Sequence, residues 1–155
     1  MMKVGNGIPG PLVMPTRGSD GAACYDVVAT RIEEIEPGKV EVFLGFATEI
    51  EPGFKGCIVP RSSFTHKGWV MQNSPAQIDP DYRGEWKIKF EAIPNYSQEL
   101  GGPLAYPIFP YKVGERVAQI YFEPIQSVDL TLVFKGLDET KRGDKGFGST
   151  GNKII

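Results

Sequence analysis

A cation, hydroxyls and backbone N–H groups meet in one short segment of this sequence, and that combination suits a phosphate group. In residues 60–68 (PRSSFTHKG), Arg61, Ser62 and Ser63 stand at the start of a turn. N–H groups and a positive dipole converge at such a start and favour an anion. The alternative is an ordinary helix start with an exposed arginine. His66, the only histidine, is better explained as a solvated turn residue than as a general base, because no partner carboxylate or serine spacing supports a triad.

A glycine-rich stretch, residues 142–151 (RGDKGFGSTG), offers donors and an aromatic ring. Its four glycines in ten residues let the backbone wrap closely around a ligand, while Arg142, Ser149 and Thr150 supply donors. Phe147 lies between glycines, and stacking on a base is a natural use for it. The stretch lacks the lysine placement of a Walker loop, which excludes a P-loop fold. By composition alone it is a mobile tail.

Carboxylates stand out in two further segments. In residues 20–27 (DGAACYDV), Asp26 follows small residues and a tyrosine on an expected strand, where a carboxylate that caps a turn is the alternative. In residues 73–87 (NSPAQIDPDYRGEWK), Asp79 and Asp81 flank a proline, and Tyr82-Arg83 follows. Turn chemistry explains a hairpin tip of Asp, Pro and Gly. It does not require the tyrosine and arginine beside the two carboxylates.

One amide lies inside an apolar run. Gln119 belongs to residues 114–122 (GERVAQIYF), where an unpaired amide would cost roughly 1–3 kcal/mol. We therefore expect it to have a partner, either neighbouring backbone or a ligand.

Strands must position these groups. Residues 86–92 and 128–134 alternate apolar and polar side chains, the period of a strand with one face buried. Shorter strands are expected at residues 40–44, 57–59, 69–72 and 117–122, separated by turns rich in Gly and Pro. The only helical signal is about one turn near residues 62–66, where Ser62 or Ser63 could serve as cap. A single antiparallel β-barrel or jelly roll follows.

Size and composition limit the function classes. The chain of 155 residues suits one domain with a real core, and 41% hydrophobic and 23% charged residues are ordinary for a globular protein. A net charge of -2 gives no general attraction to nucleic acid, so a polyanion needs a local site. No apolar run approaches the roughly 20 residues that span a membrane. With Cys24 and Cys57 as the only cysteines, we expect a soluble, intracellular protein with reduced thiols.

The five segments, in this order, resemble the five motifs of the trimeric dUTPase family. The resemblance runs from about residue 20 to 151, and IDPDYRGE and RGDKGFGSTG are its most specific strings. It implies an all-β, jelly-roll-like barrel of the dUTPase type that assembles as a homotrimer with an active site at each subunit interface. The expected domains are a barrel, residues 1–141, and a flexible C-terminal arm, residues 142–155, that closes over the site.

The implied reaction is hydrolysis of dUTP to dUMP and pyrophosphate, which limits uracil in DNA and supplies dUMP for dTMP synthesis. Asp79 matches the general base that deprotonates a water attacking the α-phosphorus. Asp26 matches a carboxylate that holds the cofactor Mg²⁺ through water. The ion neutralises charge on the leaving group. The residues that match substrate contacts at the phosphates and in the arm are Arg61, Ser62, Ser63, Gln119, Arg142, Gly148, Ser149 and Thr150, with Phe147 as the lid over uracil.

Selectivity is also implied by the resemblance. Asn73, Gln77, Ile78 and Lys87 lie where the family reads the uracil edge, largely through backbone groups. A fixed N–H donor there would face the amine of cytosine, which rejects it. The hairpin leaves no room for the methyl group of thymine, and Tyr82 matches the residue beneath deoxyribose, where a 2′-hydroxyl would collide.

Several features depart from the family pattern. Ser63 and Ala76 stand where glycine is usual, and Pro80 replaces a small residue, which affects affinity more than chemistry. Residues 96–111 form a longer connection than usual, expected on the surface, and any protein partner for it is unknown. Two other functions stay open: a dCTP deaminase or bifunctional relative, for which no convincing glutamate motif is found, and a regulatory interaction protein on the same scaffold. We expect no nucleic-acid or membrane partner.

Overall fold

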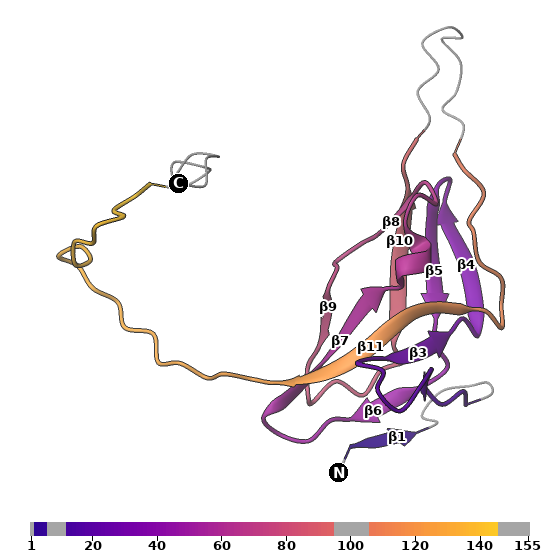
Figure 1. Cartoon of the computed structure of the whole chain (residues 1–155), viewed down its shortest axis with the longest axis horizontal. Helices are drawn as coiled ribbons and strands as arrows, with labels where there is room; N and C mark the ends of the chain where they lie inside the picture. Colours follow the sequence, from indigo (N-terminus) through magenta and orange to yellow (C-terminus); the bar gives the residue numbers. More distant parts are fainter. Residues whose placement is uncertain (1, 6–11, 95–105, 146–155) are drawn as a thin grey trace, which may run out of the picture.

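The computed structural model describes residues 2–5, 12–94 and 106–145, and its regular structure there is almost entirely β (Figure 1). All of its paired strands run antiparallel. The elements are β1 (Lys3–Gly5), β2 (Thr16–Arg17), β3 (Tyr25–Val28), β4 (Arg31–Glu36), β5 (Lys39–Phe43), β6 (Ala47–Glu49), β7 (Phe54–Pro60), the 3-10 turn η1 (Ser62–Phe64), β8 (Trp69–Met71), β9 (Ala76–Ile78), β10 (Lys87–Ala92) and β11 (Arg116–Pro124).

Two larger sheets enclose the core. One has the order β4-β5-β10-β8 and the other β2-β3-β11-β7-β9, while β1 and β6 form a separate pair. The alternation predicted for residues 86–92 is confirmed, because Ile88, Phe90 and Ala92 are buried while the residues between them are exposed. β5, β7, β8 and β11 confirm the shorter predicted strands to within a few residues. The predicted all-β class is therefore confirmed.

The strand predicted at residues 128–134 is wrong. Residues 125–145 carry no strand or helix in the structure, and Figure 1 shows them running away from the sheets after β11. The apolar members of the alternation, which include Leu130 at 92% exposure and Phe134 at 89%, do not reach the core of this chain. A strand needs a neighbour for its backbone groups, and residues 128–134 pair with no strand in the described part of the chain. The predicted boundary between barrel and arm at residue 141 stays a prediction.

The long connection before β11 returns to the core at its end. Phe109 and Tyr111 pack against the core, and the ring centroid of Tyr111 lies 5.9 Å from those of both Phe64 and Phe109. Ile108 remains exposed, and its carbonyl accepts a hydrogen bond from Trp69 Nε1 at 3.2 Å. Only part of the predicted surface connection is therefore on the surface; its residues 96–105 lie outside the described part of the chain.

Trp86 fills the centre of the core next to β7. Its side chain is fully buried, lies 5.2 Å from the Phe46 ring, and donates from Nε1 to Thr48 Oγ1 at 3.1 Å. Gly56 of β7 makes this packing possible, because a Cβ at residue 56 would lie 3.0 Å from Trp86 Cζ2 and even closer to the end of the indole.

We expect Gly56→Ala to lower the free energy of unfolding by about 1–3 kcal/mol, since the fully buried indole, packed against Phe46, must shift to admit the added methyl group. Urea denaturation measures the change. Gly18→Ala is the matched control, because a Cβ there meets nothing within 4 Å, and it should change stability by less than about 0.5 kcal/mol. Equal stability of the two variants would contradict the packing argument.

No described helix has both the length and the apolar content needed to cross a membrane.

Candidate active site

One buried carboxylate accepts hydrogen bonds from two residues of β11 and from the residue that follows β7. Asp26 in β3 is 6% exposed. Its Oδ1 accepts from Arg61 Nε at 3.1 Å and from Gln119 Nε2 at 3.2 Å, and its Oδ2 accepts from Arg116 Nη1 at 3.0 Å. One N–H of Gln119 is thus paired with a side-chain carboxylate, a kind of partner that was not among those expected, which were backbone or a ligand.

The strand register explains this cluster. Gln119 of β11 lies directly opposite Asp26 of β3. Arg61 follows the end of β7, where Pro60 pairs with Ala118. Arg116 reaches the same carboxylate because the pairing of β11 with β3 shifts between Arg116 and Ala118, and such a bulge places an extra residue in one strand.

Two guanidinium groups share this one carboxylate, so the cluster keeps one net positive charge (two minus one). Arg116 is 55% exposed in its side chain, and Arg61 Nη1 also lies 3.3 Å from the Arg116 carbonyl oxygen and 3.5 Å from Ser63 Oγ. Partly exposed arginines present a planar set of donors that matches phosphate oxygens. The cluster can therefore hold an anionic group.

The turn η1 follows this cluster, and its predicted cap is wrong. The N-cap position is Arg61, with no side-chain cap hydrogen bond. The carbonyl of Ser62 accepts from the backbone N–H and Oγ1 of Thr65, at 3.2 and 2.8 Å, while the hydroxyls of Ser62 and Ser63 are exposed. Because the turn begins one residue earlier than predicted, both serines lie inside it; both are exposed, and the Ser63 hydroxyl accepts from Arg61 Nη1 at 3.5 Å. His66 is exposed in the turn that follows, as expected of a solvated histidine.

The residues around Asp26 fit a magnesium ion only through water. An ionised carboxylate has about four acceptor positions, and the donors of Arg61, Arg116 and Gln119 use three of them. Among the residues that the structure describes, no group of three or more His, Cys, Asp or Glu side chains could hold a metal. The donor set therefore suits a hydrated ion whose other ligands come from a substrate.

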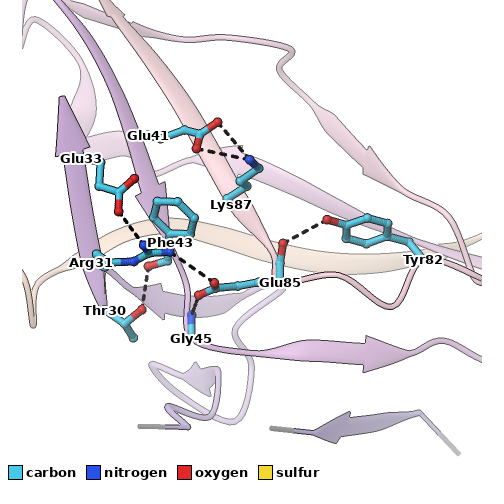
Figure 2. Close-up of polar contacts among 9 residues, drawn as sticks. All are labelled: Thr30, Arg31, Glu33, Glu41, Phe43, Gly45, Tyr82, Glu85 and Lys87. Carbon is cyan, nitrogen blue, oxygen red and sulfur yellow. Dashed lines mark hydrogen bonds and ion pairs between the residues drawn. The ribbon is translucent and has the colours of Figure 1, made fainter. Parts of the chain in front are cut away.

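A second site is a cavity of about 220 Å³ at the connection between β9 and β10. The expected β-hairpin does not form here, because β9 pairs with β7 in one sheet and β10 pairs with β5 and β8 in the other; we keep the name hairpin for the connection itself, residues 79–86. Figure 2 shows part of the cavity wall, with Tyr82, Glu85 and Lys87. Asp79 is exposed here, and its backbone carbonyl accepts from the Tyr82 N–H at 3.2 Å. The lining residues are Gln77, Ile78, Asp79, Tyr82, Glu85, Trp86 and Lys87. The structure thus brings together a carboxylate, an aromatic ring and backbone polar groups, which suit a small cyclic ligand.

Two polar side chains of this cavity already have partners. Lys87 Nζ lies 3.1 Å from Glu41 Oε1 (Figure 2), and Gln77 Oε1 accepts from Lys55 Nζ at 3.0 Å. Burial raises the pKa of the Glu41 carboxyl, but the hydrogen bonds and charges of Lys87 and Lys89 together hold it below its ordinary value. Glu41 therefore stays ionised and keeps Lys87 paired at neutral pH. Asn73, which adopts φ 51° before β9, is exposed and is not in the cavity wall.

The two sites lie at opposite ends of β7. Ile78, next to Asp79, pairs with Gly56 near the start of β7. Arg61 lies just beyond its other end. If the β7–β9 register is continued, Asp79 faces Lys55, six residues from Arg61, which is roughly 20 Å at about 3.3 Å per residue. One chain therefore does not bring its two halves of the predicted site together.

Comparison with known proteins decides the family. The family model described as dUTPase matches residues 11–151. The chain is 37% identical over 143 residues to the deoxyuridine 5'-triphosphate nucleotidohydrolase of Anaeromyxobacter sp., covering 91% of this chain and 89% of that one. It is 36% identical to the protein of the same name from Paramecium bursaria Chlorella virus 1, covering 88% and 89%. The chain belongs to the dUTPase family.

Solved structures show the same fold. The dUTPase of Staphylococcus bacteriophage 80alpha with dUPNHPP has a TM-score of 0.77 at 24% identity, covering 98% of this chain and 99% of that chain. A mutant dUTPase from phage phi11 of S. aureus, whose structure concerns a structural Mg(II) ion, has a TM-score of 0.66 at 22% identity, covering 88% and 99%. The predicted fold class is thereby confirmed as the dUTPase fold.

The remaining predicted site residues of this dUTPase-family chain belong to the arm. Arg142 is exposed and donates from Nε to the Lys145 carbonyl at 2.8 Å, within its own turn. Phe147, Gly148, Ser149 and Thr150 lie outside the described residues. Arg116 was not predicted, although it belongs to the same segment as Gln119; a cation two residues after a turn glycine was the available signal.

Proposed function

We propose that this member of the dUTPase family hydrolyses dUTP to dUMP and pyrophosphate, with Asp79 as the general base. The observation that carries the assignment of the base is that Asp79 stands in the wall of the hairpin cavity beside Tyr82. A carboxylate there needs only a hydrogen bond to the attacking water to take its proton. The water attacks the α-phosphorus, and pyrophosphate leaves.

The hairpin cavity is the proposed site for the nucleoside. Backbone groups near Gln77 and Ile78 read the uracil edge, and the Tyr82 ring packs beneath deoxyribose. Tyr82 is held for this role, because its hydroxyl donates to the Glu85 carbonyl at 3.2 Å. Lys87 stays paired with Glu41 and shapes the wall of the cavity. Asn73 helps to read the uracil edge from the turn before β9, outside the cavity wall.

The Asp26 cluster is the proposed site for the triphosphate. Arg61 and Arg116 supply charge, and the hydroxyls of Ser62 and Ser63 are exposed beside them. Gln119 orients the carboxylate of Asp26 and is itself a phosphate donor through its second N–H. Asp26 would hold Mg²⁺ through a bound water, and the ion would neutralise charge on the leaving pyrophosphate.

We further propose a homotrimer in which neighbouring chains complete each site. The distance between Asp79 and Arg61 along β7 supports this arrangement, since a nucleotide needs both ends at once. The exposed apolar side chains after β11, Val128, Leu130, Leu132 and Phe134 among them, support contact with another copy. The arm then carries Arg142, Phe147, Gly148, Ser149 and Thr150 to a site, where Phe147 covers the uracil ring.

A substrate panel tests this function. Purified protein with dUTP, dCTP, dTTP or UTP should release pyrophosphate from dUTP alone, and removal of divalent ions with EDTA should strongly reduce the rate. A fixed backbone donor that faces the wrong base edge, or a missing partner, costs a substrate orders of magnitude in kcat/KM. Ammonia release from dCTP would reassign the protein as a deaminase, and no release from any nucleotide would favour a regulatory protein on this scaffold.

A further inference from the structure

Glu85 links the β9–β10 connection to the start of β4 and to the turn after β5. It lies between the cavity residue Tyr82 and the core residue Trp86, and its side chain is only 18% exposed. Figure 2 shows the carboxylate directed away from Tyr82, toward Gly45 and Arg31, while the backbone carbonyl faces the Tyr82 hydroxyl. One residue thus contacts both the cavity and the neighbouring strands.

The contact with Gly45 satisfies a buried donor. Leu44 N–H donates to the Trp86 carbonyl and Trp86 N–H donates to the Phe46 carbonyl, both at 3.0 Å. Gly45 lies between these two bonds with φ 74°, a left-handed conformation that turns its N–H out of the ladder. Glu85 Oε1 accepts that N–H at 3.0 Å. Because Gly45 is buried, losing the carboxylate would leave its donor unsatisfied.

Arg31 holds the other side of the carboxylate. Its guanidinium carbon lies 3.5 Å from the centroid of the Phe43 ring, and its Nη2 is 3.7 Å from Glu85 Oε2. Nη1 of the same residue is paired with Glu33 at 2.5 Å. The half-exposed arginine thus contacts a ring and a second carboxylate, and it places a positive charge of β4 beside Glu85.

The position of Glu85 also determines that of Tyr82. The Tyr82 hydroxyl donates to the Glu85 carbonyl at 3.2 Å, so the ring follows the backbone at residue 85. Gly84 leaves space for the ring, because a Cβ there would lie 2.5 Å from Tyr82 Cζ. The Tyr82 N–H in turn donates to the Asp79 carbonyl at 3.2 Å. Displacing residue 85 would therefore displace the sugar platform and the proposed base together.

We infer that Glu85 is a positioning residue whose carboxylate, bonded to the Gly45 N–H, fixes Tyr82 and Asp79 for dUTP and so sets the discrimination against UTP. The inference rests on the proposed function. In this proposal Glu85 takes no part in the chemical step. It acts by holding the positions of Tyr82 and Asp79.

The test compares kcat and KM for dUTP and UTP in Glu85→Ala, Glu85→Gln and the wild-type protein. Glu85→Ala should lower kcat/KM for dUTP by roughly 10–100-fold, since small displacements of reacting groups have effects of that size, and should lower the dUTP-to-UTP ratio by about tenfold. Glu85→Gln keeps an oxygen for the Gly45 N–H and should retain the ratio to within about threefold. Glu36→Ala removes an exposed glutamate paired with Lys39 away from the hairpin and should leave both values unchanged.

The outcomes separate three cases. A loss of folded protein lowers the rates for both substrates in parallel, so an unchanged ratio in Glu85→Ala, with folding checked by thermal denaturation, would overturn the inference. A Glu85→Gln variant as poor as Glu85→Ala would overturn the assignment to the Gly45 bond. Wild-type protein that does not prefer dUTP over UTP would instead refute the proposed function.

Discussion

Asp79→Asn is expected to lower kcat for dUTP by about 10²–10⁴-fold, the usual contribution of a general base. Asparagine has nearly the same shape, so the cavity wall beside Tyr82 keeps its form, but an amide cannot accept the proton of the attacking water. Steady-state hydrolysis measures kcat, and calorimetric titration with a non-hydrolysable dUTP analogue should show nearly unchanged binding.

Asp81→Asn is the matched control for this variant. Asp81 lies on the other side of Pro80, is exposed, and is not part of the cavity wall. Its replacement should leave kcat close to the wild-type value. Full turnover in Asp79→Asn, or an equal loss in both variants, would remove Asp79 from its role as base.

Mixing two inactive variants is expected to restore hydrolysis. Asp79→Asn disables the nucleoside end of β7, and Arg61→Met disables the phosphate end. If each site takes Asp79 from one chain and Arg61 from the next, every mixed trimer holds one intact site of three. Random 1:1 mixing makes about three quarters of the trimers mixed, so the sample should reach about one quarter of the wild-type activity. The experiment unfolds and refolds the two variants together and measures dUTP hydrolysis, with native mass spectrometry to count the chains.

The control pair combines Asp79→Asn with Tyr82→Ala. Both residues line the same cavity in one chain, so no arrangement of these two variants forms an intact site, and the mixture should stay inactive. If the mixture of the Asp79 and Arg61 variants contains three-chain particles with both variants but shows no activity, a shared site is contradicted.

The sequence predicts a strand well where its alternating pattern matches one buried and one exposed face within the same chain. β10 alternates cleanly because one face meets the core and the other meets solvent, and its Trp86 end is fixed by packing against Phe46. The alternation at residues 128–134 carries the same pattern, but its apolar side chains are exposed in this chain. A period of two shows that a segment suits a strand; it does not identify the partner.

The candidate site could be predicted in part. Asp26, Arg61 and Gln119 belong to three separate segments, and the structure brings them together. Arg116 was not predicted as a site residue. On a regular strand, residues three apart point to opposite faces, which would separate Arg116 from Gln119. The bulge between Arg116 and Ala118 changes that phase. A bulge depends on the pairing of two strands, so the pattern of one strand does not reveal it.

The large apolar side chains beyond β11 also affect how the protein must be handled. A solitary chain exposes Leu130, Leu132 and Phe134 to water, on a backbone that pairs with none of the described strands. Extended apolar segments of this kind are sticky and promote aggregation. If the chain assembles as proposed, the fraction of dissociated chains rises on dilution, so dilute samples should lose a larger share of their protein by adsorption to surfaces than concentrated ones.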